Sequence, residues 1–155
     1  MSFRVSGLDP AQFLHLYGLS DGELASLGAR RCSVDATPGF PDRVELVDID
    51  PGETALLLNF EHQPVNGPYR SQHAIFVREG ATKAAVFVDE VPEVLRRRTV
   101  SLRAFDGTGE MLDADLAEGA GIEPVIRHML ANPDVSYVHV HNAKRGCYAA
   151  LVERV

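Results

Sequence analysis

Residues 137–152 bring together several side chains that could do chemistry. This segment holds His139, His141, Lys144, Arg145 and Cys147 in a pattern typical of strand, turn and strand. Side chains two positions apart on an extended strand point the same way, so His139 and His141 should share one face. The intervening valines should face a hydrophobic core. We therefore predict that the titratable groups of this hairpin occupy one surface.

The turn decides where the thiol points. Residues 143–146 fit a type I turn followed by a left-handed glycine, the commonest three-residue hairpin loop. In that register Ala143 pairs with Cys147, which would place the thiol diagonally beside His141. A loop one residue longer would pair Asn142 with Cys147 and turn the thiol to the valine face, because a one-residue slip inverts every side chain.

The three-residue register would suit nucleophilic catalysis. A neighbouring imidazolium favours the reactive thiolate form of a cysteine, and basic residues in the turn would add positive potential. On this interpretation His139, His141 and Cys147 are candidate catalytic residues. The alternative is that Cys147 only fills space at the start of a core strand.

A second cluster brackets the loop between two predicted strands. If these strands pair, His62 and His73 approach each other at the mouth of the loop, with Tyr69 and Arg70 above them. Prolines stiffen this loop by fixing φ, and loops held on a rigid sheet often carry function. The alternative is that Arg70 pairs with a carboxylate such as Glu61, and that the histidines merely cap the sheet.

If the two clusters share one cleft, six residues are the candidate ligand-binding residues: His62, Tyr69, Arg70, His73, Lys144 and Arg145. Such a set favours an anionic small molecule, through charge-assisted hydrogen bonds. Histidine could also supply acid–base chemistry near neutral pH and so transform the bound molecule. The rival function is a noncatalytic protein-interaction module, for example a homodimer, with an apolar patch in place of a polar pocket.

The motifs for metals and phosphates are missing. A His-x-His pair can give one ion two ligands, but the chain has neither His-Glu-x-x-His nor Cys-x-x-Cys. If a metal bound here, the third ligand would be His62, His73, Glu61 or Cys147. We assign no metal ligand from the sequence, and the cofactor stays unknown. Neither glycine-rich phosphate-binding motif nor a Gly-x-Ser-x-Gly elbow is present.

Short elements must position these groups. Apolar and capping patterns predict two short helices between Asp9 and Gly28, a helix at 92–98 and a longer helix carrying Ile122 to Met129. Strands are predicted at 31–35, 43–47, 54–62, 73–78, 84–88, 99–105 and 111–115, with the terminal hairpin last. Most strands are joined by turns too short for crossover helices. This favours an α+β fold with a largely antiparallel sheet, as a single domain over residues 1–155.

Composition narrows the class of protein. The chain has 155 residues, of which 45% are hydrophobic and 24% charged, as expected for one soluble globular domain. Its net charge of −7 argues against nucleic-acid or membrane-surface binding. Arg96–Arg98, together with Arg103, forms the dense basic cluster, which is either a solvated face or an anion site. Two cysteines are too few for a disulfide scaffold, and no secretory signal is evident, so we expect a cytoplasmic protein.

Several segments, in this order along the chain, carry a resemblance to a known family: Leu57-Leu-Asn-Phe-Glu-His-Gln-Pro64, Pro68-Tyr-Arg70, His73-Ala-Ile-Phe-Val-Arg-Glu79 and His139-Val-His-Asn-Ala-Lys-Arg-Gly-Cys-Tyr148, among others. Through them the chain resembles the uncharacterised bacterial family catalogued as domain of unknown function 1203. That family has no established activity or catalytic residue. The resemblance therefore implies a bacterial, single-domain protein and transfers no residue role.

Overall fold

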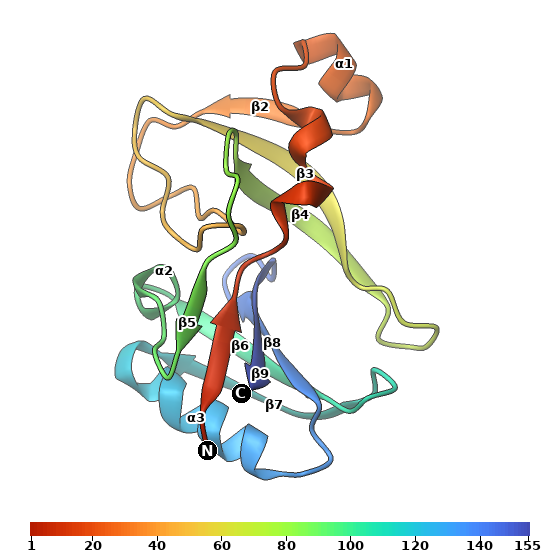
Figure 1. The fold of residues 1–155 in the computed structure, drawn as a ribbon, viewed down its shortest axis with the longest axis vertical. Helices are drawn as coiled ribbons and strands as arrows, with labels where there is room; N and C mark the ends of the chain where they lie inside the picture. Colours follow the sequence, from red (N-terminus) through yellow and green to blue (C-terminus); the bar gives the residue numbers. More distant parts are fainter.

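A computed structural model describes residues 1–155. The chain forms two antiparallel sheets, which lie one above the other in the view of Figure 1. The larger sheet has the strand order β5-β1-β9-β8-β6-β7, and the smaller one has the order β2-β3-β4. The expected α+β class is confirmed, with the difference that the strands divide between two sheets.

The elements have the following bounds. The strands are β1 (Phe3–Ser6), β2 (Arg30–Ser33), β3 (Thr54–Gln63), β4 (Ser71–Arg78), β5 (Val86–Val88), β6 (Thr99–Phe105), β7 (Met111–Glu118), β8 (Tyr137–Asn142) and β9 (Tyr148–Arg154). The α-helices are α1 (Asp21–Ser26), α2 (Glu93–Arg96) and α3 (Ile122–Ala131). Short 3-10 turns are η1 (Pro10–Gln12), η2 (Leu14–Leu16) and η3 (Gly119–Gly121).

One face of the six-stranded sheet forms the main core. The valines of β8 are fully buried there, together with Ile126 and Met129 of α3. Helix α3 lies along this face in Figure 1, and its apolar residues belong to this core. Strand alternation then turns the histidines of β8 to the opposite face, towards the smaller sheet.

The N-terminal half departs from the sequence prediction in three places. Asp9 caps a 3-10 turn through Ala11 N, and the expected first helix is two such turns. The second predicted helix, by contrast, is present as α1, and Ser20 and Glu23 form its expected capping box. The predicted strand at 43–47 is wrong: this segment is a loop, in which Leu46 has a φ of 53°. Strand β1 was not predicted, because only four residues carry its pattern.

None of the helices has the length and hydrophobicity that a membrane-spanning helix needs.

Glu79 ties the N-terminal segment to the smaller sheet and should be sensitive to pH. Its carboxylate accepts hydrogen bonds from Arg31, from the Thr54 hydroxyl and from Gly18 N. These bonds lower the pKa of Glu79 from 4.5 to about 2, so the folded state stabilises the charged form. The stabilisation is therefore present above pH 4.5 and is lost as the pH falls through about 2.

We expect Glu79→Gln to lower the free energy of unfolding at pH 7 by about 1.5–3 kcal/mol. Urea denaturation at pH 7 and pH 3 should show a smaller difference from the unmodified protein at the lower pH. Glu61→Gln is the control, because its pair with Arg70 is exposed and worth little. Equal effects of the two substitutions would contradict the role of Glu79.

Candidate functional site

Three histidines meet between the two sheets. His139 and His141 come from β8, and His62 comes from β3 after an irregularity in the pairing between Phe60 and Gln63. The His62 ring centroid lies 4.9 Å from that of His141 and 5.9 Å from that of His139. The predicted shared face of the two β8 histidines is thus observed, and tertiary packing adds a third imidazole.

Two of these imidazoles are buried, His62 is half-buried, and all three are incompletely hydrogen-bonded. His139 is 5% exposed and His141 is 1% exposed. His141 Nδ1 lies 3.0 Å from the Gly146 carbonyl, which can only accept, so Nδ1 carries the proton and Nε2 presents a lone pair. Three buried ring nitrogens have no partner: His62 Nδ1, His139 Nδ1 and His141 Nε2.

Burial keeps the three imidazoles neutral. Loss of hydration lowers the pKa of His62 to about 4 and the pKa values of His139 and His141 to about 3. At pH 7 the cluster therefore contributes no positive charge of its own. This differs from the expectation that these histidines would act as acid–base groups near neutral pH or help to attract an anion.

Aromatic rings enclose the cluster. Tyr148 stacks on His62 with centroids 5.3 Å apart and an interplanar angle of 12°. Phe105 and Tyr137 pack against His139 from the other side. Tyr69, a predicted ligand-binding residue, packs edge-on against Phe105 with ring centroids 6.3 Å apart and so belongs to this aromatic wall. Aromatic rings therefore form most of the surroundings of the histidines.

Arg103 is a neighbour that the sequence pattern grouped with Arg96–Arg98 and not with the histidines. It lies on β6 directly opposite His139, and its Nε donates to the Ser101 hydroxyl. No carboxylate pairs with it, and partial burial lowers its pKa. The alternation of Leu102 and Ala104 into the core could have placed Arg103 on the other face of β6. Only the pairing of β6 with β8 places it beside the histidines.

Cys147 points away from the histidines. The hairpin adopts the longer of the two possible registers: Asn142 N donates to Cys147 O at 2.9 Å, and Gly146 N donates to Asn142 O at 2.7 Å. An irregularity after Val140 then pairs His141 with Tyr148. The prediction of Cys147 beside His141 is therefore wrong, because the additional loop residue turns the thiol to the valine face.

The thiol instead lies at a buried arginine. Arg43 Nη2 donates to Cys147 Sγ at 3.0 Å, and Arg43 Nε donates to Tyr148 O at 2.8 Å. Arg43 is 2% exposed, and its burial lowers the pKa of its guanidinium. Sequence reasoning missed this residue, because it lies in the segment that was predicted to be a strand.

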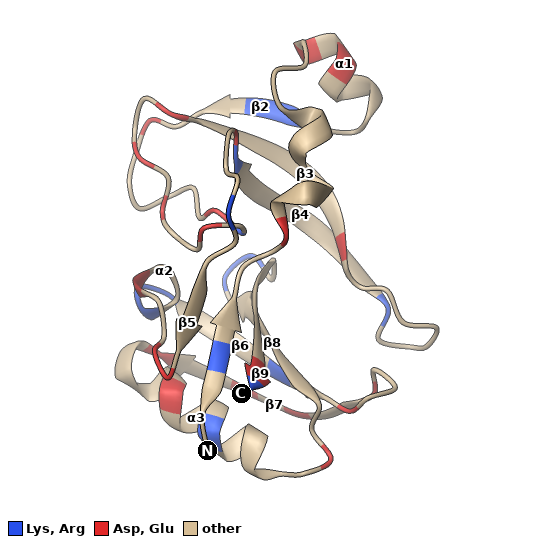
Figure 2. Ribbon diagram, in the orientation of Figure 1, with Lys and Arg blue, Asp and Glu red and all other residues tan.

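A cavity of about 750 Å³ opens next to this pair. It brings together four predicted residues, His73, Lys144, Arg145 and Cys147. Arg43, Arg97 and Arg98 add three more cations to its wall, and none of its lining residues is acidic. In Figure 2 both α2 and the β8–β9 turn carry blue segments where the two sheets approach each other. Phe40 and Phe76, with ring centroids 5.0 Å apart, form an apolar part of the wall.

The cations of this cavity differ in whether they already form an ion pair within the protein. Arg98 pairs with the buried Asp48 carboxylate at 2.6 Å, and Arg97 contacts the same carboxylate at 3.4 Å. Lys144 and Arg145 are exposed and form no ion pair. The turn residues are therefore the cations available to a ligand.

Arg70 belongs neither to the histidine cluster nor to the cation-lined cavity. Its side chain is 63% exposed and pairs with Glu61 at 3.2 Å, as in the alternative interpretation of this loop. The predicted residues thus divide into an enclosed histidine cluster with Tyr69, a cation-lined cavity with His73 and Cys147, and the surface residue Arg70.

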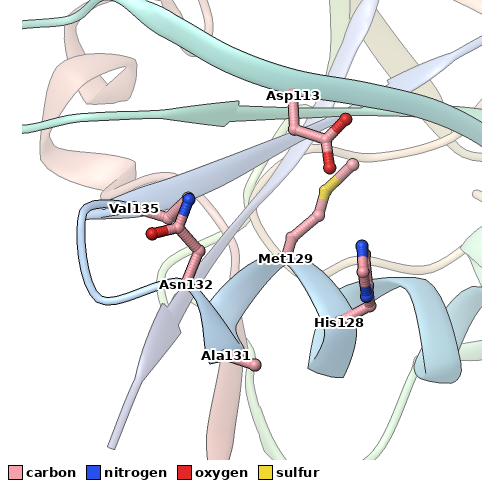
Figure 3. Close-up of a pocket in the computed structure, with 6 residues that line it drawn as sticks. All are labelled: Asp113, His128, Met129, Ala131, Asn132 and Val135. Atoms are coloured by element: carbon pink, nitrogen blue, oxygen red, sulfur yellow. The ribbon is translucent and has the colours of Figure 1, made fainter.

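A smaller hollow lies between β7 and α3. It measures about 390 Å³, and Figure 3 shows Met129 extending towards Asp113, with His128 beside it on the helix. The hollow contains no cluster of partnerless buried polar groups, and we assign it no function.

Comparison with known proteins matches residues 39–154 to the family described as "Protein of unknown function (DUF1203)". No curated protein and no solved structure matches the chain. The matched range contains every residue of the histidine cluster and of the cation-lined cavity.

Proposed function

Since the chain belongs to the DUF1203 family, whose description gives no activity, we propose its function from the geometry of the site: it binds an organic anion in the cation-lined cavity. The observation that carries this proposal is a wall with five lysine and arginine side chains and no acidic one, of which only Arg97 and Arg98 have a carboxylate partner, in a chain of net charge −7. Such a concentration of one sign raises the local concentration of anions.

The wall also indicates what kind of anion fits. Lys144 and Arg145 are free to form charge-assisted hydrogen bonds with a carboxylate or phosphate. Phe40 and Phe76 offer apolar surface to the remainder of the molecule. The volume of about 750 Å³ exceeds what a bare inorganic ion would fill and lies in the range of small-molecule sites. An aromatic carboxylate or phosphate ester therefore matches the cavity best.

We further propose that this binding takes place in the bacterial cytoplasm. Cys32 and Cys147 are both free thiols, the state that a reducing compartment maintains.

A thermal-shift titration tests the binding. Benzoate and phenyl phosphate should raise the melting temperature in a concentration-dependent manner, because a ligand of the native state stabilises it by mass action. Benzamide, which has no charge, should give little shift. Replacing both turn cations (Lys144→Ala, Arg145→Ala) should weaken the binding of the anions about 10-fold or more.

The matched control removes the same two charges elsewhere. Arg30 and Lys83 are exposed, form no ion pair and lie outside the cavity. Their double alanine variant should bind the anions like the unmodified protein. Equal weakening in both double variants would show unspecific attraction, and no shift with either anion would contradict the proposal.

A protein-interaction module is the second candidate function, and an edge of the larger sheet is its basis. Leu116 is 63% exposed and Leu112 is 42% exposed on β7, the last strand of that sheet. However, Asp113 and Asp115 accept hydrogen bonds from the N–H groups of the residues that follow them. Carboxylates at a strand edge oppose pairing with another strand. Light scattering of the purified protein would detect a homodimer and so support this second function.

A further inference from the structure

The anion cavity leaves the histidine cluster without a role. We propose that His62, His139 and His141 bind one divalent transition-metal ion, for which zinc is the best match, with an open coordination position facing Arg103. This site is independent of the anion cavity, because Cys147 and the histidines face opposite sides of the terminal hairpin.

The geometry suits three ligands to one ion. One ring nitrogen from each histidine lies within 4.8 Å of the other two. Nitrogens bound tetrahedrally at about 2.1 Å from zinc are about 3.4 Å apart. Small rotations of the imidazole rings would bring the three atoms to that spacing. Two ligands come from one strand and the third comes from the neighbouring sheet, so the fold itself holds the triad together.

The unpartnered nitrogens indicate that something is to be bound. Buried polar groups in native proteins are nearly always hydrogen-bonded, yet three imidazole nitrogens at this one place have no partner. A histidine that binds a metal must be a neutral imidazole with a free lone pair, and burial among aromatic rings favours that form. A single metal ion would use these lone pairs together.

His141 already has the support that metal-binding histidines usually have. Its Nδ1–H donates to the Gly146 carbonyl, which fixes the ring and leaves Nε2 as the coordinating atom. Hydrogen bonds of this kind orient metal-bound histidines and raise their basicity. The glycine that permits the left-handed turn thus also positions a ligand.

Arg103 predicts what occupies the open position. Three neutral imidazoles leave the charge of the metal uncompensated, and Arg103 adds another positive charge that no carboxylate neutralises. An anion coordinated to the metal would balance both charges and accept a hydrogen bond from the guanidinium. We therefore expect a metal-bound anion, such as hydroxide or a carboxylate, rather than a fourth protein ligand.

Metal binding is measured on the full-length protein, purified without affinity metal and stripped with a chelator. Zinc should bind with a stoichiometry of one, measured by competition with a chromophoric chelator. Each of the single variants His62→Gln, His139→Gln and His141→Gln should weaken zinc at least about 100-fold, more than is usual for loss of an outer-shell partner. His15→Gln and His128→Gln, outside the cluster, are the controls and should bind zinc normally.

Cobalt reports the geometry and the open position. Co²⁺ should bind the unmodified protein and give the visible absorption of a four-coordinate site, and azide should change this spectrum. Arg103→Met should retain cobalt but weaken azide, whereas Arg103→Lys should restore part of the azide affinity.

Two further measurements distinguish a variant that fails to fold from one that folds but does not bind zinc. Circular dichroism reports whether each variant folds, and His62→Gln is the most informative, since His62 is the least buried of the three. On the unmodified protein, zinc should shift the imidazole resonances of three histidines and leave those of the other three unchanged. Absence of stoichiometric zinc, or equal loss in the His15 and His128 variants, would overturn the proposal.

Discussion

Gly7→Ala is expected to lower the free energy of unfolding by about 3 kcal/mol or more. A β carbon at this position would lie 2.0 Å from the carbonyl oxygen of Val44 and 2.8 Å from its carbonyl carbon. Both are main-chain atoms, so no side-chain rotation can relieve the overlap. Gly7 follows β1 directly and lets that strand cross the loop that carries Arg43.

The clash cannot be relieved by a shift of the loop without breaking hydrogen bonds. Leu8 N donates to Arg43 O at 2.8 Å, and Ala85 N donates to Val44 O at 2.9 Å. Moving the loop would disrupt both bonds and displace the Arg43 side chain from the thiol. We therefore expect Gly7→Ala to weaken anion binding as well as stability.

Urea denaturation monitored by circular dichroism measures the first effect. Gly22→Ala is the control, because Gly22 lies in α1, a β carbon added to it would have no atom within 4 Å, and alanine favours a helix. That control should be neutral or stabilising by up to about 1 kcal/mol. A Gly7→Ala protein that unfolds at the same urea concentration as Gly22→Ala would contradict the close approach of these segments.

Arg43→Met is expected to lower the free energy of unfolding by about 2 kcal/mol or more. The guanidinium donates to the carbonyls of Tyr148 and Pro41, which belong to different parts of the chain. Methionine fills a similar volume but leaves both carbonyls without this donor, at a cost of about 1–3 kcal/mol each. Removal of a buried charge offsets part of this loss, which is why we expect less than the sum.

Arg97→Met is the matched control for this substitution. Arg97 also lines the cavity, but its side chain is 46% exposed, and Arg98 holds the same carboxylate without it. We expect Arg97→Met to change the stability by less than about 1 kcal/mol. Thermal and urea unfolding that ranked the two variants equally would show that Arg43 does not join the loop to the hairpin.

The local features of this protein could be predicted from its amino-acid sequence. Period-two alternation located most strands, including the one that presents His139 and His141 together, and the Ser20–Glu23 capping box located α1. Gly146 was correctly expected in the left-handed region. Each of these features depends on residues within a few positions of one another, so the local pattern contains the information.

Which of these side chains lie beside one another was decided only by the tertiary structure. The register of the terminal hairpin depended on one loop residue, and that residue separated Cys147 from the histidines. His62 and Arg103 reached the cluster, and Arg43 reached Cys147, through contacts between segments far apart in the chain. Sequence patterns carry the period of a strand but not the identity of its neighbour, because pairing and sheet packing are set by burial over the whole molecule.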